Sequence, residues 1–135
     1  MAVTLFRDAN GQFRRLLAGC LRLARGFCEW YLRPSTREER GLKLLREWLS
    51  REQLAQYDAR DYFEVIGCHT GKRYRICHGI GANVFELDDA GLRRTGWCFV
   101  LKDPLVAGDV MLAQKIALET DELAALAVAN KFTPR

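Results

Sequence analysis

Residues 61–102 read DYFEVIGCHTGKRYRICHGIGANVFELDDAGLRRTGWCFVLK. Short runs in which apolar and polar residues alternate are separated by turns that contain glycine, a pattern typical of an antiparallel β-meander. We place a two-residue turn at Thr70-Gly71. This turn makes Phe63 face His78 across the first hairpin and predicts that His78 points inward.

In this register, one face of the hairpin is apolar and includes Val65 and Ile76. The opposite face carries Arg73 and Arg75. A slip of one residue would exchange the two faces and bury both arginines, so the alternation favours this assignment of faces.

The later strands are expected at about residues 83–88 and 97–101, and each alternates in the same way. We expect Phe85 and Leu87 to point inward on the first of these. On the second, Trp97 should point inward.

Helical patterns lie on both sides of the meander. The span from Gln12 to Leu32 has apolar residues at three- and four-residue steps, with arginines on its other face. Pro34 ends this helix. Capping boxes then begin a second helix at Ser35 or Thr36 and a short third helix at Ser50.

After the meander, Asp109 is a good N-cap for a helix from Val110 to Asn130, with an interruption expected at Thr120-Asp121. Its apolar residues are expected to cover one face of the sheet. They are Met111, Leu112, Ile116, Leu118, Leu123, Leu126 and Val128. The fold class is therefore α+β: a three- to four-stranded antiparallel meander packed against a C-terminal helix and preceded by two or three N-terminal helices.

The chain has 135 residues, of which 49% are hydrophobic, which suits one packed domain. The predicted organisation is a basic amphipathic helical region at 1–33 and an α+β domain at 34–135. The sequence contains neither a secretion signal nor an apolar run of about 18 residues that could cross a membrane. With five cysteines in an odd, unpatterned set, we expect free thiols and a cytoplasmic location.

Positive charge is concentrated in the N-terminal part of the chain. Residues 1–50 contain ten Arg or Lys against five acidic residues, whereas residues 51–135 contain eleven against twelve. This balance permits a polyanionic partner such as nucleic acid. The candidate contacts are Arg14, Arg15, Arg22, Arg25, Arg73 and Arg75.

The N-terminal helix also offers an apolar stripe to a protein partner or to a second copy of the chain. The candidate docking residues are Phe13, Leu17, Leu21, Trp30 and Tyr31. Basic residues beside Trp30 and Tyr31 leave a membrane-surface helix as a weaker alternative.

Two Cys-His pairs, Cys68-His69 and Cys77-His78, resemble metal ligands but match no familiar zinc spacing. In the register above, the sulfurs of Cys68 and Cys77 lie on the order of 13 Å apart along the strands, too far to share an ion. Adjacent strand residues point to opposite faces, so we also expect Cys68 and His69 to be too far apart for nucleophilic catalysis. We therefore assign no catalytic residue, no metal site and no cofactor.

Several segments are similar to those of a known set of proteins. They are Leu49-Ser-Arg-Glu-Gln53, Tyr62-Phe-Glu-Val-Ile-Gly67, Thr70-Gly-Lys-Arg-Tyr-Arg-Ile76, Asn83-Val84 and the run from Gly108 to Glu122. Over about residues 42–131 the chain resembles a set of small bacterial and phage-associated proteins of unknown function. The resemblance implies no activity and transfers no site residue.

From the sequence we favour a non-enzymatic protein-interaction module that docks through helix 12–32. The second hypothesis is a nucleic-acid-binding accessory protein that uses basic residues of this helix and of the sheet. The third is a small enzyme with an unrecognised site, and any small-molecule ligand stays open.

Overall fold

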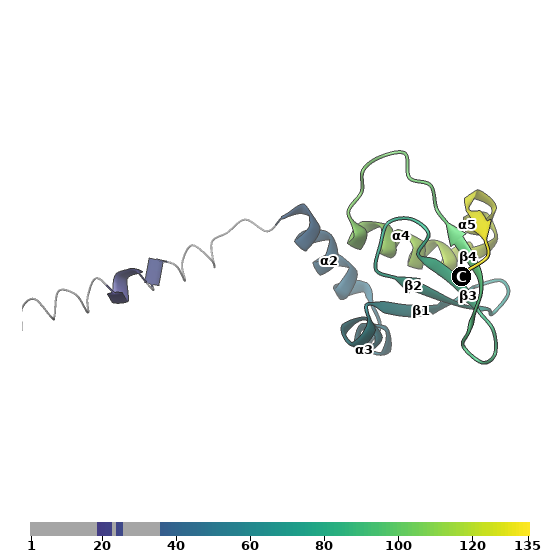
Figure 1. Cartoon of the computed structure of the whole chain (residues 1–135), viewed down its shortest axis with the longest axis horizontal. Coiled ribbons are helices and arrows are strands. Elements are labelled where there is room, and N and C mark those ends of the chain that lie inside the picture. Colours follow the sequence, from purple (N-terminus) through teal and green to yellow (C-terminus); the bar gives the residue numbers. More distant parts are fainter. Residues whose placement is uncertain (1–18, 23, 26–35) are drawn as a thin grey trace, which may run out of the picture. The chain divides into compact units, whose positions relative to one another are not determined.

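The computed structural model describes residues 19–22, 24–25 and 36–135. The chain divides into two units, Met1–Pro34 and Ser35–Arg135, and each is described by itself. In the first unit the described residues are helical, and the rest of the predicted helix 12–32 lies outside the described residues. The second unit is an α+β fold, as predicted (Figure 1).

Two helices begin the second unit, α2 at Arg37–Trp48 and α3 at Arg51–Arg60. Both start with the predicted capping boxes, in which Thr36 and Ser50 accept a backbone N–H three residues on. The apolar side of α2 is only partly buried. Leu45 and Leu49 are buried, whereas Leu44 and Trp48 are 43% and 58% exposed.

Five antiparallel strands form one sheet in the order β1-β2-β3-β4-β5. Their bounds are β1 Tyr62–Ile66, β2 Arg73–Cys77, β3 Val84–Leu87, β4 Arg93–Cys98 and β5 Asn130–Phe132. The meander is confirmed, but its last strand was expected at about residues 97–101 and instead spans Arg93–Cys98, and the sequence did not reveal β5. Asn130, which we expected to end the C-terminal helix, instead begins a strand that extends the sheet beside β4.

The predicted assignment of faces is correct, but the predicted register of the first hairpin is wrong by two residues. Phe63 pairs with Ile76, and Gly67 bonds to Lys72 across a four-residue loop. His78 therefore lies beyond the ladder, where it is exposed and its Nδ1 lies 2.8 Å from the hydroxyl of Tyr57. A longer turn keeps the parity of the strands, so the error leaves the faces unchanged.

The predicted orientation of β3 is also wrong. Phe85 pairs with Arg75 on the face opposite to the core, whereas Val84 pairs with the inward-facing Trp97. By alternation, Leu87 shares the face of Phe85. A bulge between Glu86 and Leu87 shifts the register with β4.

Two helices follow the meander, α4 at Ala107–Thr120 and α5 at Glu122–Val128. The predicted interruption at Thr120-Asp121 is confirmed. The predicted N-cap at Asp109 is wrong, because α4 begins three residues earlier, after Val106, with no side-chain cap.

The core lies between the inner face of the sheet and the helices α2 and α4 (Figure 1). Met111 and Leu118 of α4 are fully buried against Phe63 and Tyr74 of the sheet. The expected apolar cover from the C-terminal helix is only partly right. Ile116, Leu123 and Val128 are 41%, 58% and 75% exposed.

Helices α2 and α4 cross at a pair of glycines. A Cβ atom added at Gly108 would overlap the backbone carbonyl of Gly41, so only the absence of side chains allows this approach. The crossing fixes the start of α4 against α2.

Helix α3 covers the free edge of the sheet. The side-chain amide of Gln53 donates to the carbonyl of Glu64 at 2.9 Å, and the amide oxygen of Gln56 accepts the Glu64 N–H at 2.9 Å. These bonds replace the partners that a further strand would supply. They therefore block pairing at the β1 edge.

Candidate functional site

A buried carboxylate organises the loop between β1 and β2. Glu122, the first residue of α5, is fully buried. Its Oε2 accepts the backbone N–H groups of His69 and Thr70 at 2.9 and 2.8 Å. Its Oε1 accepts the Tyr74 hydroxyl at 2.6 Å and the Thr70 hydroxyl.

Burial alone would raise the pKa of Glu122, because it disfavours the charged form. The hydrogen bonds from Thr70, Tyr74 and the backbone of His69 outweigh this effect and lower the pKa to about 2. Burial and the bond to Glu122 raise the pKa of Tyr74, whose hydroxyl stays protonated as a donor. The carboxylate is therefore ionised and fully hydrogen-bonded at neutral pH.

Gly67 leaves the space that this carboxylate occupies. A Cβ atom at Gly67 would overlap the carboxylate group of Glu122. A glycine is therefore needed just after β1 because a side chain there would displace the Glu122 carboxylate. The backbone does not require it, since the φ value of Gly67 is not in the left-handed region.

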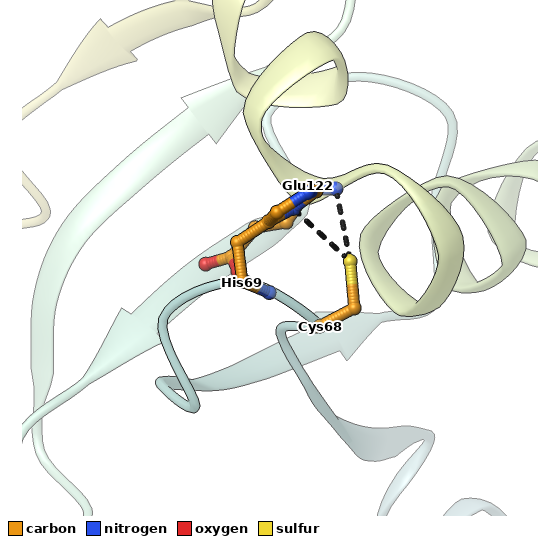
Figure 2. A group of neighbouring side chains, drawn as sticks. All are labelled: Cys68, His69 and Glu122. Atoms are coloured by element: carbon orange, nitrogen blue, oxygen red, sulfur yellow. Dashed lines mark hydrogen bonds between the residues drawn. The ribbon is translucent and has the colours of Figure 1, made fainter.

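The prediction that Cys68 and His69 point apart is wrong, because both lie in the four-residue loop rather than on a strand. Cys68 Sγ lies 3.2 Å from His69 Nδ1 and accepts the backbone N–H of Glu122 at 3.4 Å. Figure 2 shows the contacts from the sulfur to these two groups as dashed lines. Both loop residues are exposed.

A thiol and an imidazole at this distance satisfy the first geometric requirement for an activated nucleophile. Catalysis also needs a group that orients the base, an oxyanion site and a substrate cavity. A polar cavity of about 370 Å³ beside the loop is lined by Thr70 and Lys72 but by neither Cys68 nor His69. The thiol–imidazole pair is therefore accessible, but neither of its residues lines this cavity.

Cys68, His69 and Glu122 also form the one group of three metal-ligating residues found among the described residues, with ligand atoms within 4.8 Å of one another. A carboxylate offers about four acceptor positions, two on each oxygen. In Glu122 all four are already used by Thr70, Tyr74 and the backbone of His69. The donor set therefore fits a structural clamp better than a metal centre.

The second Cys-His pair takes no part in this group. Cys77 pairs with Tyr62 on β1, and its sulfur lies 3.7 Å from the guanidinium of Arg93. Burial raises the pKa of the Cys77 thiol, which makes it a weak nucleophile. Cys98 ends β4 beside Asn130 of β5.

The candidate polyanion contacts fall into three groups. Arg14 and Arg15 lie outside the described residues. Arg22 and Arg25 are helical and exposed in the first unit. Arg73 and Arg75 lie on the outer face of the sheet, where both pair with Glu64 at 2.7 and 2.9 Å.

These ion pairs change the pKa of the Glu64 carboxyl group. Burial would raise the pKa of Glu64, but the hydrogen bonds from Arg73 and Arg75 lower it. One half-buried carboxylate thus holds two arginines on the sheet surface.

Of the candidate docking residues, Leu21 is the one that lies within the described residues, and it is 64% exposed. Phe13, Leu17, Trp30 and Tyr31 lie outside them.

Sequence reasoning missed Glu122 because an acidic residue in the first turn of a helix is usually a solvated one. The pattern Asp121-Glu122 gives no sign that the first carboxylate caps the helix and the second is buried. Glu122 is buried because α5 packs against the β1–β2 loop, and no local sequence pattern indicates this long-range contact.

No known protein family, no curated protein and no solved structure matches this chain. Among the described residues, no helix has the length and apolar character needed to cross a membrane.

Proposed function

We propose that this chain is a non-enzymatic protein-interaction module that self-associates by docking its N-terminal amphipathic helix onto a second copy. The observation that carries the proposal is an apolar groove of about 190 Å³ on the α+β unit. The groove lies between the segment 99–106, α4 and α5. Its lining residues are Phe99, Leu101, Leu105, Val110, Ala113, Gln114, Ala117, Ala125 and Val128.

The groove suits the apolar stripe of a helix. Its volume matches one or two leucine-sized side chains, which is how an amphipathic helix anchors itself in a groove. Val128 and Leu105 on its rim are 75% and 39% exposed. Leu21 of the N-terminal unit is 64% exposed and supplies a side chain of the required kind.

Charge supports the same pairing. Residues 1–34 contain six arginines and two acidic residues, whereas residues 99–129, the span that includes the groove lining, contain five acidic residues, one of them the buried Glu122, and two lysines. A basic helix is therefore attracted to this side of the domain, which favours the correct encounter.

The test is the molar mass of the full chain by analytical ultracentrifugation over a concentration series. We expect reversible association that Leu21→Asp and Val128→Arg each abolish, since the first places a charge in the docking stripe and the second repels the arginines. Leu92→Asp is the matched control, because Leu92 is 66% exposed in the β3–β4 turn and lies outside the groove. A wild-type chain that stays monomeric at every concentration refutes self-association, and retained association in both variants refutes the groove.

A further inference from the structure

The outer face of the sheet, which faces away from the core, carries an ordered row of side chains. The strand registers place Glu64, Arg75, Phe85, Gly96 and Phe132 side by side, one on each of the five strands. At about 4.8 Å between strands, the row is about 19 Å long. Helix α4 packs on the opposite face, so this row is not part of the core (Figure 1).

Two arginines on this face place their guanidinium groups over aromatic rings. The guanidinium carbon of Arg75 lies 4.3 Å from the ring centre of Tyr62, and that of Arg93 lies 4.2 Å from the ring centre of Phe85. The rings hold each guanidinium plane in place, which reduces the entropy that a ligand must overcome. A guanidinium held in this way can stack on a base or bind a phosphate through two N–H groups.

Aromatic surface is also available beside the arginines. The ring of Phe132 lies over Gly96, where a Cβ atom would overlap it, and meets Phe85 edge to face at 6.0 Å. Phe132 and Tyr62 are half-buried, so part of each ring is accessible. These two rings lie at opposite sides of the face, on β5 and β1.

The face has a positive charge that its own carboxylate does not balance. Arg73, Arg75 and Arg93 are its basic residues on the strands, and Arg60 joins them by donating to the Tyr62 hydroxyl at 2.9 Å. Glu64 is the acidic residue on the outward strand positions and is shared by two of these arginines. The arginines therefore exceed it by three charges.

We infer that this face binds single-stranded nucleic acid, with bases against Phe132, Tyr62 and the guanidinium planes and with phosphates on the arginines. A single strand exposes both stacking surfaces and charge, and both are present here. An acidic peptide offers the charge without planar bases. A duplex keeps its bases stacked inside, where a broad sheet face does not reach them.

This inference concerns a different surface and a different partner from the proposed self-association, so either can fail alone. The test is fluorescence anisotropy of the full chain with labelled oligothymidylate and oligouridylate of about 12 nucleotides, a typical length for one small binding domain. Two to three phosphate contacts predict that affinity falls roughly 7- to 20-fold between about 50 and 200 mM salt.

Variants separate stacking from simple charge. We expect Phe132→Ala to weaken binding about fivefold or more through loss of base stacking. Arg93→Gln should weaken binding and flatten the salt dependence. Glu64→Gln should tighten binding about threefold, since it releases two arginines and adds one net positive charge. Arg40→Gln, on the exposed side of α2, is the matched control and should leave the affinity unchanged.

Several results would overturn the inference. They are the absence of binding to either oligonucleotide at about 50 mM salt, equal affinity for a duplex or for polyglutamate, and unchanged affinity in Phe132→Ala. Binding through the N-terminal arginines would give this last result. Circular dichroism melting of each variant shows whether it is folded, and a gain of affinity in Glu64→Gln cannot arise from unfolding.

Discussion

Replacement of Glu122 by Gln tests whether a buried carboxylate holds the β1–β2 loop to α5. The substitution keeps the size of the side chain. It exchanges one accepting oxygen for an NH₂ group that cannot accept from the hydroxyl or N–H donors around it. Hydrogen bonds to charged groups contribute about 1.5–3 kcal/mol each, and their loss leaves buried donors unpaired. We expect Glu122→Gln to lower the free energy of unfolding by about 2–4 kcal/mol at pH 7.

The pH dependence gives an independent magnitude. The pKa of Glu122 is about 2 in the folded chain, against an ordinary value of 4.5. At about 1.4 kcal/mol per pH unit, this difference corresponds to about 3 kcal/mol of stability. Because the folded-state pKa is the lower one, the contribution is complete above about pH 4.5 and is lost as the pH falls from there toward 2.

The assay is urea unfolding followed by circular dichroism between pH 2 and pH 6. Glu64 also has a lowered pKa, so the quantity to compare is the difference between the wild-type and Glu122→Gln curves. We expect this difference to shrink as the pH falls below about 4.5. Glu47→Gln, on the exposed side of α2, is the control and should follow the wild type. A constant difference across the whole pH range, or no destabilisation at pH 7, would refute the carboxylate clamp.

Three further outcomes follow from the same structure. Gly108→Ala should lower the free energy of unfolding by about 1–3 kcal/mol, because the added Cβ atom forces α2 away from α4. Gly81→Ala is the control and should leave the free energy of unfolding almost unchanged, because its Cβ atom would meet nothing within 4 Å. Equal effects in urea unfolding would contradict the close crossing. Iodoacetamide should label the exposed Cys68 faster than the half-buried Cys77 by mass spectrometry, and the reverse order would contradict the described loop. Stoichiometric zinc should neither co-purify with the chain nor raise its melting temperature, because the carboxylate near Cys68 has no free acceptor position; zinc found by metal analysis would show that Glu122 can exchange its partners.

The sequence predicted what depends on local pattern. Alternation in β1 and β2 correctly assigned Phe63 and Tyr74 to one face. The error in turn length is two residues, and a shift of two residues leaves every side chain on the same face. The capping boxes at Thr36 and Ser50 span only four consecutive positions and were predicted correctly. The break between α4 and α5 was visible for the same reason.

The errors arose where tertiary contacts decide the structure. The run VFEL points to the wrong side of β3. Its fully apolar side, Phe85 and Leu87, lies on the outer face, where Arg93 and Phe132 cover Phe85, whereas Val84 and Glu86 lie on the inner side. Strand β5 forms because β4 offers an open edge with which it can pair. The three residues of β5 are too few to indicate a strand from their own sequence. The loop with Cys68 and His69 is shaped by a carboxylate more than fifty residues away in the chain.

The two proposed surfaces differ in charge, and this difference makes them separable in one experiment. Residues 99–129, the span that includes the groove lining, contain three more acidic than basic residues, whereas arginines dominate the outer face of the sheet. A basic helix is repelled by the second surface and drawn to the first, while a nucleic acid has the opposite preference. Helix docking relies mainly on apolar contact, so added salt should weaken it little, but the same salt should release a single strand because condensed counterions compete for the arginines. Association that persists at high salt while oligonucleotide binding disappears would place the two activities on different surfaces. If both disappear together, a common electrostatic surface is the simpler account, and the apolar groove would lose its role.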